Sequence, residues 1–239
     1  MPFARVRRSN AVHRRHAAPV REEELAPEVS PSNVAGRRVS GPSQGFGQLW
    51  RKRFWVRLNP AYPPTDVVHE WKRNFSAFWP EGSQLTGRIE EQAVAGADLE
   101  MPAGTKIATG LVVVRSDVDS FTLMTLQGHM FAGWVRFSAR EDGATTRVEV
   151  EVLMRAGDPV YEAGLMLGGH RTEEEFWKQT LRKVAAHFRQ QPAVEMAATL
   201  EDPGRQWSRV RNTWYNAAIR TQLQRGWRWL TSLPGRLGR

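Results

Sequence analysis

The sequence predicts an α+β domain in which one curved antiparallel sheet wraps around a long helix near the end of the domain. The first observation behind this fold class is a strict alternation over residues 145–155, where Val148 to Met154 place apolar side chains on one face and charged side chains on the other. The second is an apolar stripe at helical spacing over residues 172–190. With 239 residues, 41% of them hydrophobic, the chain can build one such domain with extensions at both ends.

The basic character of the chain is concentrated at its two ends. Residues 1–52 hold ten Arg or Lys against four Glu, and residues 201–239 hold eight Arg against one Glu and one Asp. Residues 53–200 hold sixteen basic against nineteen acidic side chains, although the whole chain carries a charge of +9. Clustered basic residues are typical of proteins that bind nucleic acid or anionic membranes. Such binding is therefore predicted for the ends and not for the domain.

Several classes of protein and site are excluded by what the sequence lacks. There is no cysteine, which removes disulfides and cysteine-ligated metals. No run of about 18 apolar residues predicts a membrane-spanning helix, and residues 1–21 lack the apolar stretch of a secretory signal. Glycine-rich phosphate and dinucleotide motifs are absent, and His129, His170 and His187 match no metal-ligand spacing. We therefore expect a cytoplasmic protein without a metal or a cofactor.

The chain divides into three predicted parts. Residues 1–45 have few large apolar side chains and no helical or strand period, so we expect a disordered basic extension. The six Arg and absent acids of residues 1–21 also suit a mitochondrial transit peptide, but the amphipathic period of such peptides is missing. Residues 46–192 form the domain. Residues 193–239 are predicted to be a basic, tryptophan-rich, amphipathic helical tail.

Within the domain, periodicity and turn residues define the order of elements. The predicted strands span residues 53–58, 106–115, 120–125, 130–140 and 145–155. The predicted helices span residues 65–78, 158–167 and 172–190. Asp142-Gly143 suits a tight hairpin between the last two strands, and Thr172 suits the N-cap of the last helix. The helices should cover one face of the sheet and leave the other to solvent.

The stretch from Thr125 to Phe137 contains a histidine bracketed by two glycines in an apolar context. Glycine inside a strand usually marks a bulge or the close approach of another group. Gly128 and Gly133 are therefore expected to bend the sheet around a pocket. His129 is the single candidate for a general acid or base, and the best candidate for a polar contact with a ligand.

The residues Thr125-Leu126-Gln127-Gly128-His129, followed by Gly133 and Phe137, resemble the "TLPGHPExGEExF" signature of a domain-of-unknown-function family. That family belongs to the START-like, or SRPBCC, helix-grip superfamily, which also holds lipid-transfer proteins, plant allergens and polyketide aromatase/cyclases. The resemblance covers about residues 50–190. It implies a cavity between the curved sheet and the last helix that holds a lipid-like or polycyclic guest. Gln127 replaces the proline of the signature, Met130-Phe131 replaces its Pro-Glu, and Trp134-Val135 replaces its paired glutamates, so any chemistry of those acids is lost here.

Three functions follow from these observations, and the first is preferred. It is a non-enzymatic protein that binds a hydrophobic small molecule or lipid. The second is a cyclase-type or hydrolase-type enzyme that uses His129. The third is a scaffold whose basic tail docks at the periphery of an anionic membrane or, less favoured, on nucleic acid.

The residues predicted for these roles fall into two sets. The ligand-binding set is His129, Phe131, Trp134, Trp71, Phe75, Phe121, Val150, Val152, Trp177 and Leu181. The set predicted to contact a membrane or nucleic acid is Trp207, Arg209, Arg211, Trp214, Arg220, Arg225, Trp227, Arg228 and Trp229.

Overall fold

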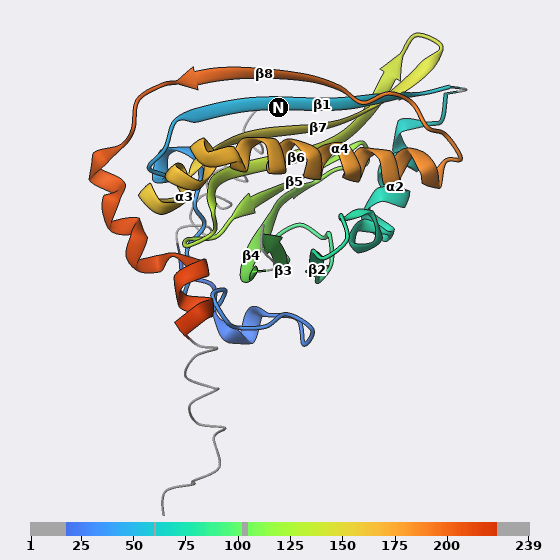
Figure 1. Cartoon of the computed structure of the whole chain (residues 1–239). Coiled ribbons are helices and arrows are strands. Elements are labelled where there is room, and N and C mark those ends of the chain that lie inside the picture. Colours follow the sequence, from blue (N-terminus) through green and yellow to red (C-terminus); the bar gives the residue numbers. More distant parts are fainter. Residues whose placement is uncertain (1–17, 60, 102–104, 224–239) are drawn as a thin grey trace, which may run out of the picture.

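A computed structural model describes residues 18–59, 61–101 and 105–223 of the chain. In these ranges the strands form one antiparallel sheet in the order β2-β3-β4-β5-β6-β7-β1-β8. The strands are β1 (Leu49–Leu58), β2 (Gln84–Thr86), β3 (Val94–Met101), β4 (Thr105–Ser116), β5 (Ser120–Thr125), β6 (Phe131–Asp142), β7 (Thr145–Ala156) and β8 (Glu195–Asp202). The sheet curves around the long helix α4 (His170–His187), as Figure 1 shows. The predicted α+β fold class is confirmed.

Shorter helices complete the described part of the chain. They are the α-helices α2 (Pro64–Arg73) and α3 (Pro159–Gly164), the 3₁₀-helices η1 (Glu22–Glu24), η2 (Pro42–Gln44), η3 (Phe75–Phe78) and η6 (Trp207–Tyr215), and the π-helical turn η5 (Leu165–Gly169). A further helical stretch covers residues 217–223. In the described residues, no helix combines the length and the apolar character needed to cross a bilayer.

The β6–β7 hairpin is the longest pairing in the sheet and behaves as its alternation predicts. Asp142 pairs with Thr145 across the turn, and Gly143 has the positive φ of 62° that a tight hairpin needs. Val148, Val150 and Val152 of β7 are buried on the concave face. This hairpin carries the inner surface on which the helices pack.

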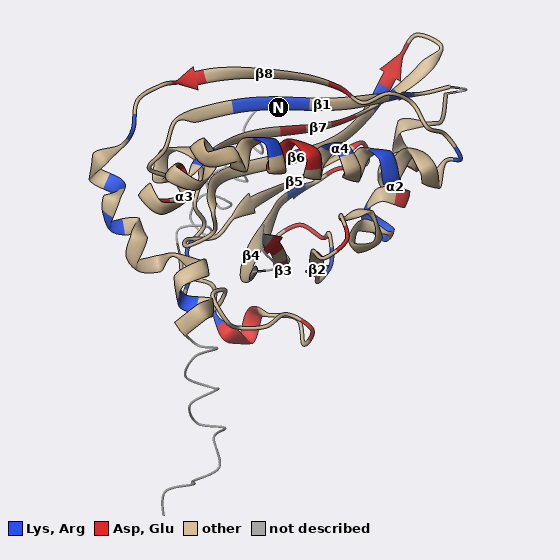
Figure 2. Ribbon diagram, in the orientation of Figure 1, with Lys and Arg blue, Asp and Glu red and all other residues tan. Residues whose placement is uncertain are grey.

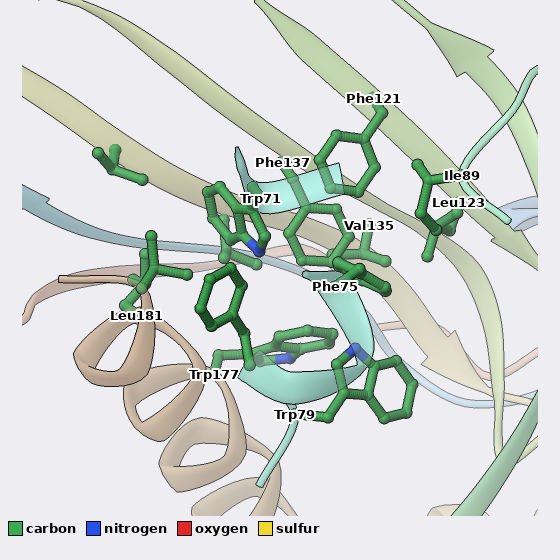
Figure 3. Packing of buried hydrophobic residues seen from close by; sticks show 14 of the residues in the cluster. Trp71, Phe75, Trp79, Ile89, Phe121, Leu123, Val135, Phe137, Trp177 and Leu181 are labelled. Atoms are coloured by element: carbon green, nitrogen blue, oxygen red, sulfur yellow. The ribbon is translucent and has the colours of Figure 1, made fainter. Parts of the chain in front are cut away.

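Aromatic side chains fill the half of the concave face that lies under α2. The rings of Phe121 and Phe137 stack on neighbouring strands with centroids 4.7 Å apart. Phe75 meets the Phe137 ring edge to face at 5.0 Å, and Trp71 meets it at 5.2 Å. Figure 3 shows these rings gathered together, with Trp177 reaching toward them from α4. The apolar stripe predicted for residues 65–78 is therefore confirmed as core, although the α-helix gives way to η3 near its end.

The N-terminal segment packs against the convex face of the sheet, contrary to the disorder expected for residues 1–45. Val20, Val29 and Val34 form a second buried cluster with Val112 of β4 and with Leu126. The convex face is thus covered over β3 and β4, where an uncovered face was expected. The valines of this segment have no helical or strand period, so the sequence alone does not predict that they are ordered. They become buried because β3, which was not predicted, provides an apolar surface. Residues 1–17 lie outside the described residues.

The domain also extends beyond residue 192, because β8 pairs with β1 along its free edge. The helical tail predicted from residue 193 is therefore wrong for Glu195–Asp202. Cross-strand charge pairs explain the extended conformation, since Arg51 Nε donates to Glu201 at 2.7 Å and Arg57 pairs with Glu195. Figure 2 shows acidic residues at the two ends of β8, which lies beside β1 and its basic residues.

Helix α4 begins two residues before the predicted cap, so Thr172 lies inside the helix. Asp158 is instead the N-cap of the preceding helix, α3. Its Oδ1 accepts hydrogen bonds from the amide N–H groups of Val160 and Tyr161 at 2.8 and 3.1 Å. Gly168, with φ of 112°, turns the chain inside the π-helical turn η5, two residues before α4 begins. A positive φ is readily adopted only by glycine, so this residue sets the start of α4.

Candidate functional site

A cavity of about 490 Å³ lies between the concave face of the sheet and the first turns of α4. Apolar side chains of β6, β7 and α4 form part of its wall, and residues of η5 form part of its rim. The lining residues are Trp79, Ser83, Leu99, Glu100, Leu111, Thr125, His129, Met130, Phe131, Gly133, Trp134, Val135, Val152, Met154, Tyr161, Gly164, Leu165, Leu167, Gly168, Gly169, Thr172, Glu173, Phe176 and Trp177. Among these described residues there is no Lys and no Arg.

Half of the ligand-binding residues predicted from the sequence line this cavity. They are His129, Phe131, Trp134, Val152 and Trp177. The other half, namely Trp71, Phe75, Phe121, Val150 and Leu181, belong to the packed core instead. The reason is the placement of α2 and η3, whose side chains fill the space that the sheet would otherwise leave open at that end. The cavity therefore lies toward α3 and η5, and it extends as far as Trp79 and Leu99 on the side of η3 and β3.

His129 lies in the wall of the cavity and is buried. Its Nδ1 accepts the backbone N–H of Phe131 at 3.0 Å, so the neutral ring carries its proton on Nε2. Burial lowers the pKa of His129 to about 4. The ring is therefore neutral near pH 7 and has one N–H to donate. These properties suit a polar contact better than a general base, whose pKa should lie near the working pH.

The two glycines around His129 have different structural roles. A Cβ on Gly133 would collide with the backbone of Leu153 on β7, so this glycine permits close pairing of the strands. A Cβ on Gly128 would collide with the carbonyl oxygen of Tyr215, and Gly128 also has a φ of 95°. The group that approaches Gly128 is therefore the C-terminal segment, whose Ala217 N–H donates to the Gly128 carbonyl at 2.9 Å.

A buried ionic cluster lies beside the cavity and was not predicted. Lys52 of β1 is 1% exposed, and its Nζ lies 2.7 Å from Glu173 Oε2 and 2.8 Å from Glu174 Oε1. The Nζ also lies 3.2 Å from His170 Nδ1. Burial raises the pKa of Glu173, and it also lowers the pKa of His170, with Lys52 adding to that second shift.

The inward position of Lys52 could have been predicted from the sequence. Lys52 is two residues before Phe54, so it continues the inward alternation of β1 that Val56 and Leu58 extend. A lysine at an inward position must find partners in the interior. The strand was predicted to begin at residue 53, which left this lysine outside the pattern.

A second, smaller cavity of about 220 Å³ lies on the other side of His129. Its lining includes Arg38, Asp158, Arg209 and Asn212, so it is polar where the first is apolar. Asp158 is already paired, since the Asn216 side-chain amide donates to its Oδ2 at 2.7 Å. Among the described residues, no group of three or more His, Cys, Asp or Glu side chains is placed to hold a metal ion.

The C-terminal segment leaves its predicted contact residues at the surface. Trp207 is 72% exposed and Trp214 is 82% exposed, although Trp207 also meets the Phe46 ring edge to face at 5.3 Å. Arg209, Arg211 and Arg220 are exposed as well. The remaining predicted contacts, Arg225, Trp227, Arg228 and Trp229, lie outside the described residues.

Comparison with known proteins shows no matching family model and no matching curated protein. Among solved structures, the chain is similar to protein Ms6760 from Mycobacterium smegmatis, with 15% identity, a TM-score of 0.44, and coverage of 58% of this chain and 90% of that one. It is similar to the di-domain ARO/CYC StfQ from the steffimycin biosynthetic pathway, with 14% identity, a TM-score of 0.44, and coverage of 58% of this chain and 50% of that one. It is also similar to ginseng major latex-like protein 151 from Panax ginseng, with 16% identity, a TM-score of 0.41, and coverage of 59% and 98%. Likenesses at this level do not identify a function, so the cavity and its lining are the basis for one.

Proposed function

We propose that this protein binds a hydrophobic small molecule or lipid in the cavity between its sheet and α4. The observation that carries the proposal is an apolar cavity of about 490 Å³. Pockets of roughly 300–1,000 Å³ with mostly apolar walls are the usual sites for small ligands. A few polar groups in the wall, including His129 and Glu173, would orient the guest.

A binding assay with a cavity-filling variant tests this proposal. Val152→Phe adds a ring to the cavity wall, and Val118→Phe makes the same change at a position that is 74% exposed in the β4–β5 turn. We expect the apolar dye Nile red to bind the unchanged protein and Val118→Phe equally. It should bind Val152→Phe at least about tenfold more weakly, because the new phenyl ring occupies part of the cavity. Native mass spectrometry of the purified protein should also detect a co-purified guest. Dye binding that is equal in all three proteins would contradict the proposal.

A second candidate function is docking on an anionic membrane, and the exposed apolar side chains near the rim of the cavity favour it. Leu167 lines the cavity yet is 89% exposed, and Met166 beside it is 67% exposed. Arg205 links this turn to the C-terminal segment, because its Nη2 lies 3.4 Å from Met166 Sδ. The C-terminal segment also exposes Trp207 and Trp214, so apolar and basic side chains both occur in this segment and at the rim. Such a combination suits the interface of a bilayer that contains anionic lipid.

Cosedimentation with lipid vesicles tests the docking. We expect the full chain to bind phosphatidylserine-containing vesicles, to bind pure phosphatidylcholine vesicles poorly, and to lose binding when Trp207 and Trp214 are both changed to Ser. Val118→Ser, an exposed apolar side chain in the β4–β5 turn, is the control and should bind as before. Binding to single-stranded RNA with a steep salt dependence, without vesicle binding, would instead support the nucleic-acid alternative.

A further inference from the structure

The second, polar cavity lies where the N-terminal and C-terminal segments of the chain meet. Its volume is about 220 Å³, and its lining comes from residues 38–44, 127–129, 157–158 and 209–212. Among the described residues, His129 alone lines both this cavity and the apolar one. The second cavity is therefore built by two segments that the sequence analysis treated as separate basic extensions.

Each of these two segments places an arginine in the lining of the second cavity. Arg38 and Arg209 are both exposed to solvent. In the described part of the chain, neither side chain takes part in a hydrogen bond or an ion pair. Arg205 of the same C-terminal segment, by contrast, pairs with Glu162 at 2.9 Å. The N–H donors of Arg38 and Arg209 are therefore available to an external anion.

The carboxylate in this cavity does not neutralise the arginines. Among the described lining residues, Asp158 is the one acidic side chain. Its Oδ1 accepts the backbone N–H groups of Val160 and Tyr161, and its Oδ2 accepts from the Asn216 amide at 2.7 Å. These three N–H donors already stabilise its charge. Since His129 is neutral near pH 7, two positive charges face one negative charge in the described lining.

The backbone that carries both arginines is held by hydrogen bonds around the cavity. The Gln127 N–H donates to the Arg38 carbonyl at 2.8 Å. Asn212, on the same 3₁₀-helix as the second arginine, donates from Nδ2 to the carbonyls of Gln44 and Gly157 at 2.7 and 2.8 Å. A site whose backbone is already ordered loses less conformational entropy when it binds an anion.

We propose that the second cavity binds a phosphate group, which Arg38 and Arg209 hold from the two segments. A planar guanidinium bonds two phosphate oxygens in a forked geometry. A phosphate monoester carries close to two negative charges near pH 7 and has three terminal oxygens, so it accepts from both arginines at once. A carboxylate has one charge and two oxygens, and it matches the pair less well. The inference does not depend on the hydrophobic guest proposed for the first cavity.

Calorimetric titration of the full chain with glycerol 3-phosphate, near pH 7.5 and at fixed ionic strength, tests the site. We expect the unchanged protein to bind this ester at least about tenfold more tightly than acetate. Arg38→Gln and Arg209→Gln should each weaken the phosphate at least about tenfold, because each removes one of its two cationic partners. Arg211→Gln is the matched control and should bind as before, because Arg211 is exposed on the same 3₁₀-helix and does not line the cavity.

Vesicles that contain phosphatidic acid carry the same phosphate group on a lipid, so they distinguish two sources of the ligand. Vesicle binding that needs both arginines and is displaced by glycerol 3-phosphate would support a lipid head group. Binding of the soluble ester without vesicle binding would support a soluble phosphate monoester.

Three results would overturn the phosphate site. They are no binding of either probe, equal affinities for glycerol 3-phosphate and acetate, and an equal loss of binding in Arg211→Gln, which would indicate general attraction to a basic segment. Nile red binding should be the same in the unchanged protein and in both arginine variants of the cavity. The phosphate site can therefore fail while the apolar cavity still binds its guest, and the reverse also holds.

Discussion

The two halves of the concave face are formed by the same curved sheet, yet one half is filled and the other holds a cavity. Under α2, four rings pack with centroids 4.7 to 6.1 Å apart, and Phe121 and Phe137 are fully buried. Near the start of α4, three glycines line the space: Gly164, Gly168 and Gly169. Glycine has no side chain with which to fill the volume beneath it. The covering helices, and not the sheet, therefore decide where the cavity lies.

Replacing one aromatic ring in each half should give the largest difference in the free energy of unfolding between the two halves. Phe137→Ala in the filled half removes a fully buried ring, and we expect it to lower the free energy of unfolding by about 4 kcal/mol. Phe131→Ala on the cavity wall removes a partly buried ring that already borders empty space, so about 1 kcal/mol is expected. Urea denaturation measures both. Equal losses would mean that the cavity is closed in solution.

The stability of the cavity half should depend on the charge of Lys52. Lys52→Met leaves Glu173 buried without its cation, and we expect the free energy of unfolding to fall by about 3 kcal/mol. The double variant Lys52→Met with Glu173→Leu should recover most of this loss, because it leaves no uncompensated charge at that position. Thermal or urea unfolding of the single and double variants provides the measurement. A single variant as stable as the unchanged protein would mean that Glu173 is not held by Lys52.

The cavity half should also respond to pH through His129. The pKa of His129 is lowered to about 4 in the folded protein from 6.5, so the unfolded chain binds more protons between these values. Stability due to this group is therefore fully present above the unfolded pKa and is lost as the pH falls toward the folded pKa. Between pH 6.5 and about pH 5 we expect a loss of about 1.5 kcal/mol. His129→Gln should lack this part of the pH dependence, and an unchanged profile in that variant would refute the assignment.

The rim of the cavity should contribute least to stability. Leu167 is 89% exposed, so Leu167→Ser is expected to change the free energy of unfolding by less than about 0.5 kcal/mol. The same variant should bind anionic vesicles more weakly if the rim docks on a membrane. A large loss of stability would instead place Leu167 inside the fold in solution, and the rim would be closed.

Local patterns predicted the parts of the fold that have strong periods. The alternation of residues 145–155 corresponds to β7, the Asp142-Gly143 turn to its hairpin, and the stripe of residues 172–190 to α4. Strand β3 was missed because Val94–Met101 contains Gly96, two alanines and two acids, which are poor signals for a strand. Strand β8 was missed because its side chains are mostly exposed and its partner strand begins well over a hundred residues earlier in the chain.

The sequence by itself determined the fold class, the apolar concave face and the position of His129 in its wall. The first two follow from side-chain periods, and the third follows from the two glycines and the apolar residues around His129, all of which depend only on neighbouring residues. The tertiary structure alone decided which apolar residues pack together and which border a cavity, because that choice depends on where α2, η5 and α4 cross the sheet. It also decided that Lys52 and Glu173, 121 residues apart, meet in the interior. Long-range contacts of this kind leave no period in the sequence, so only the folded chain reveals the polar end of the proposed binding site.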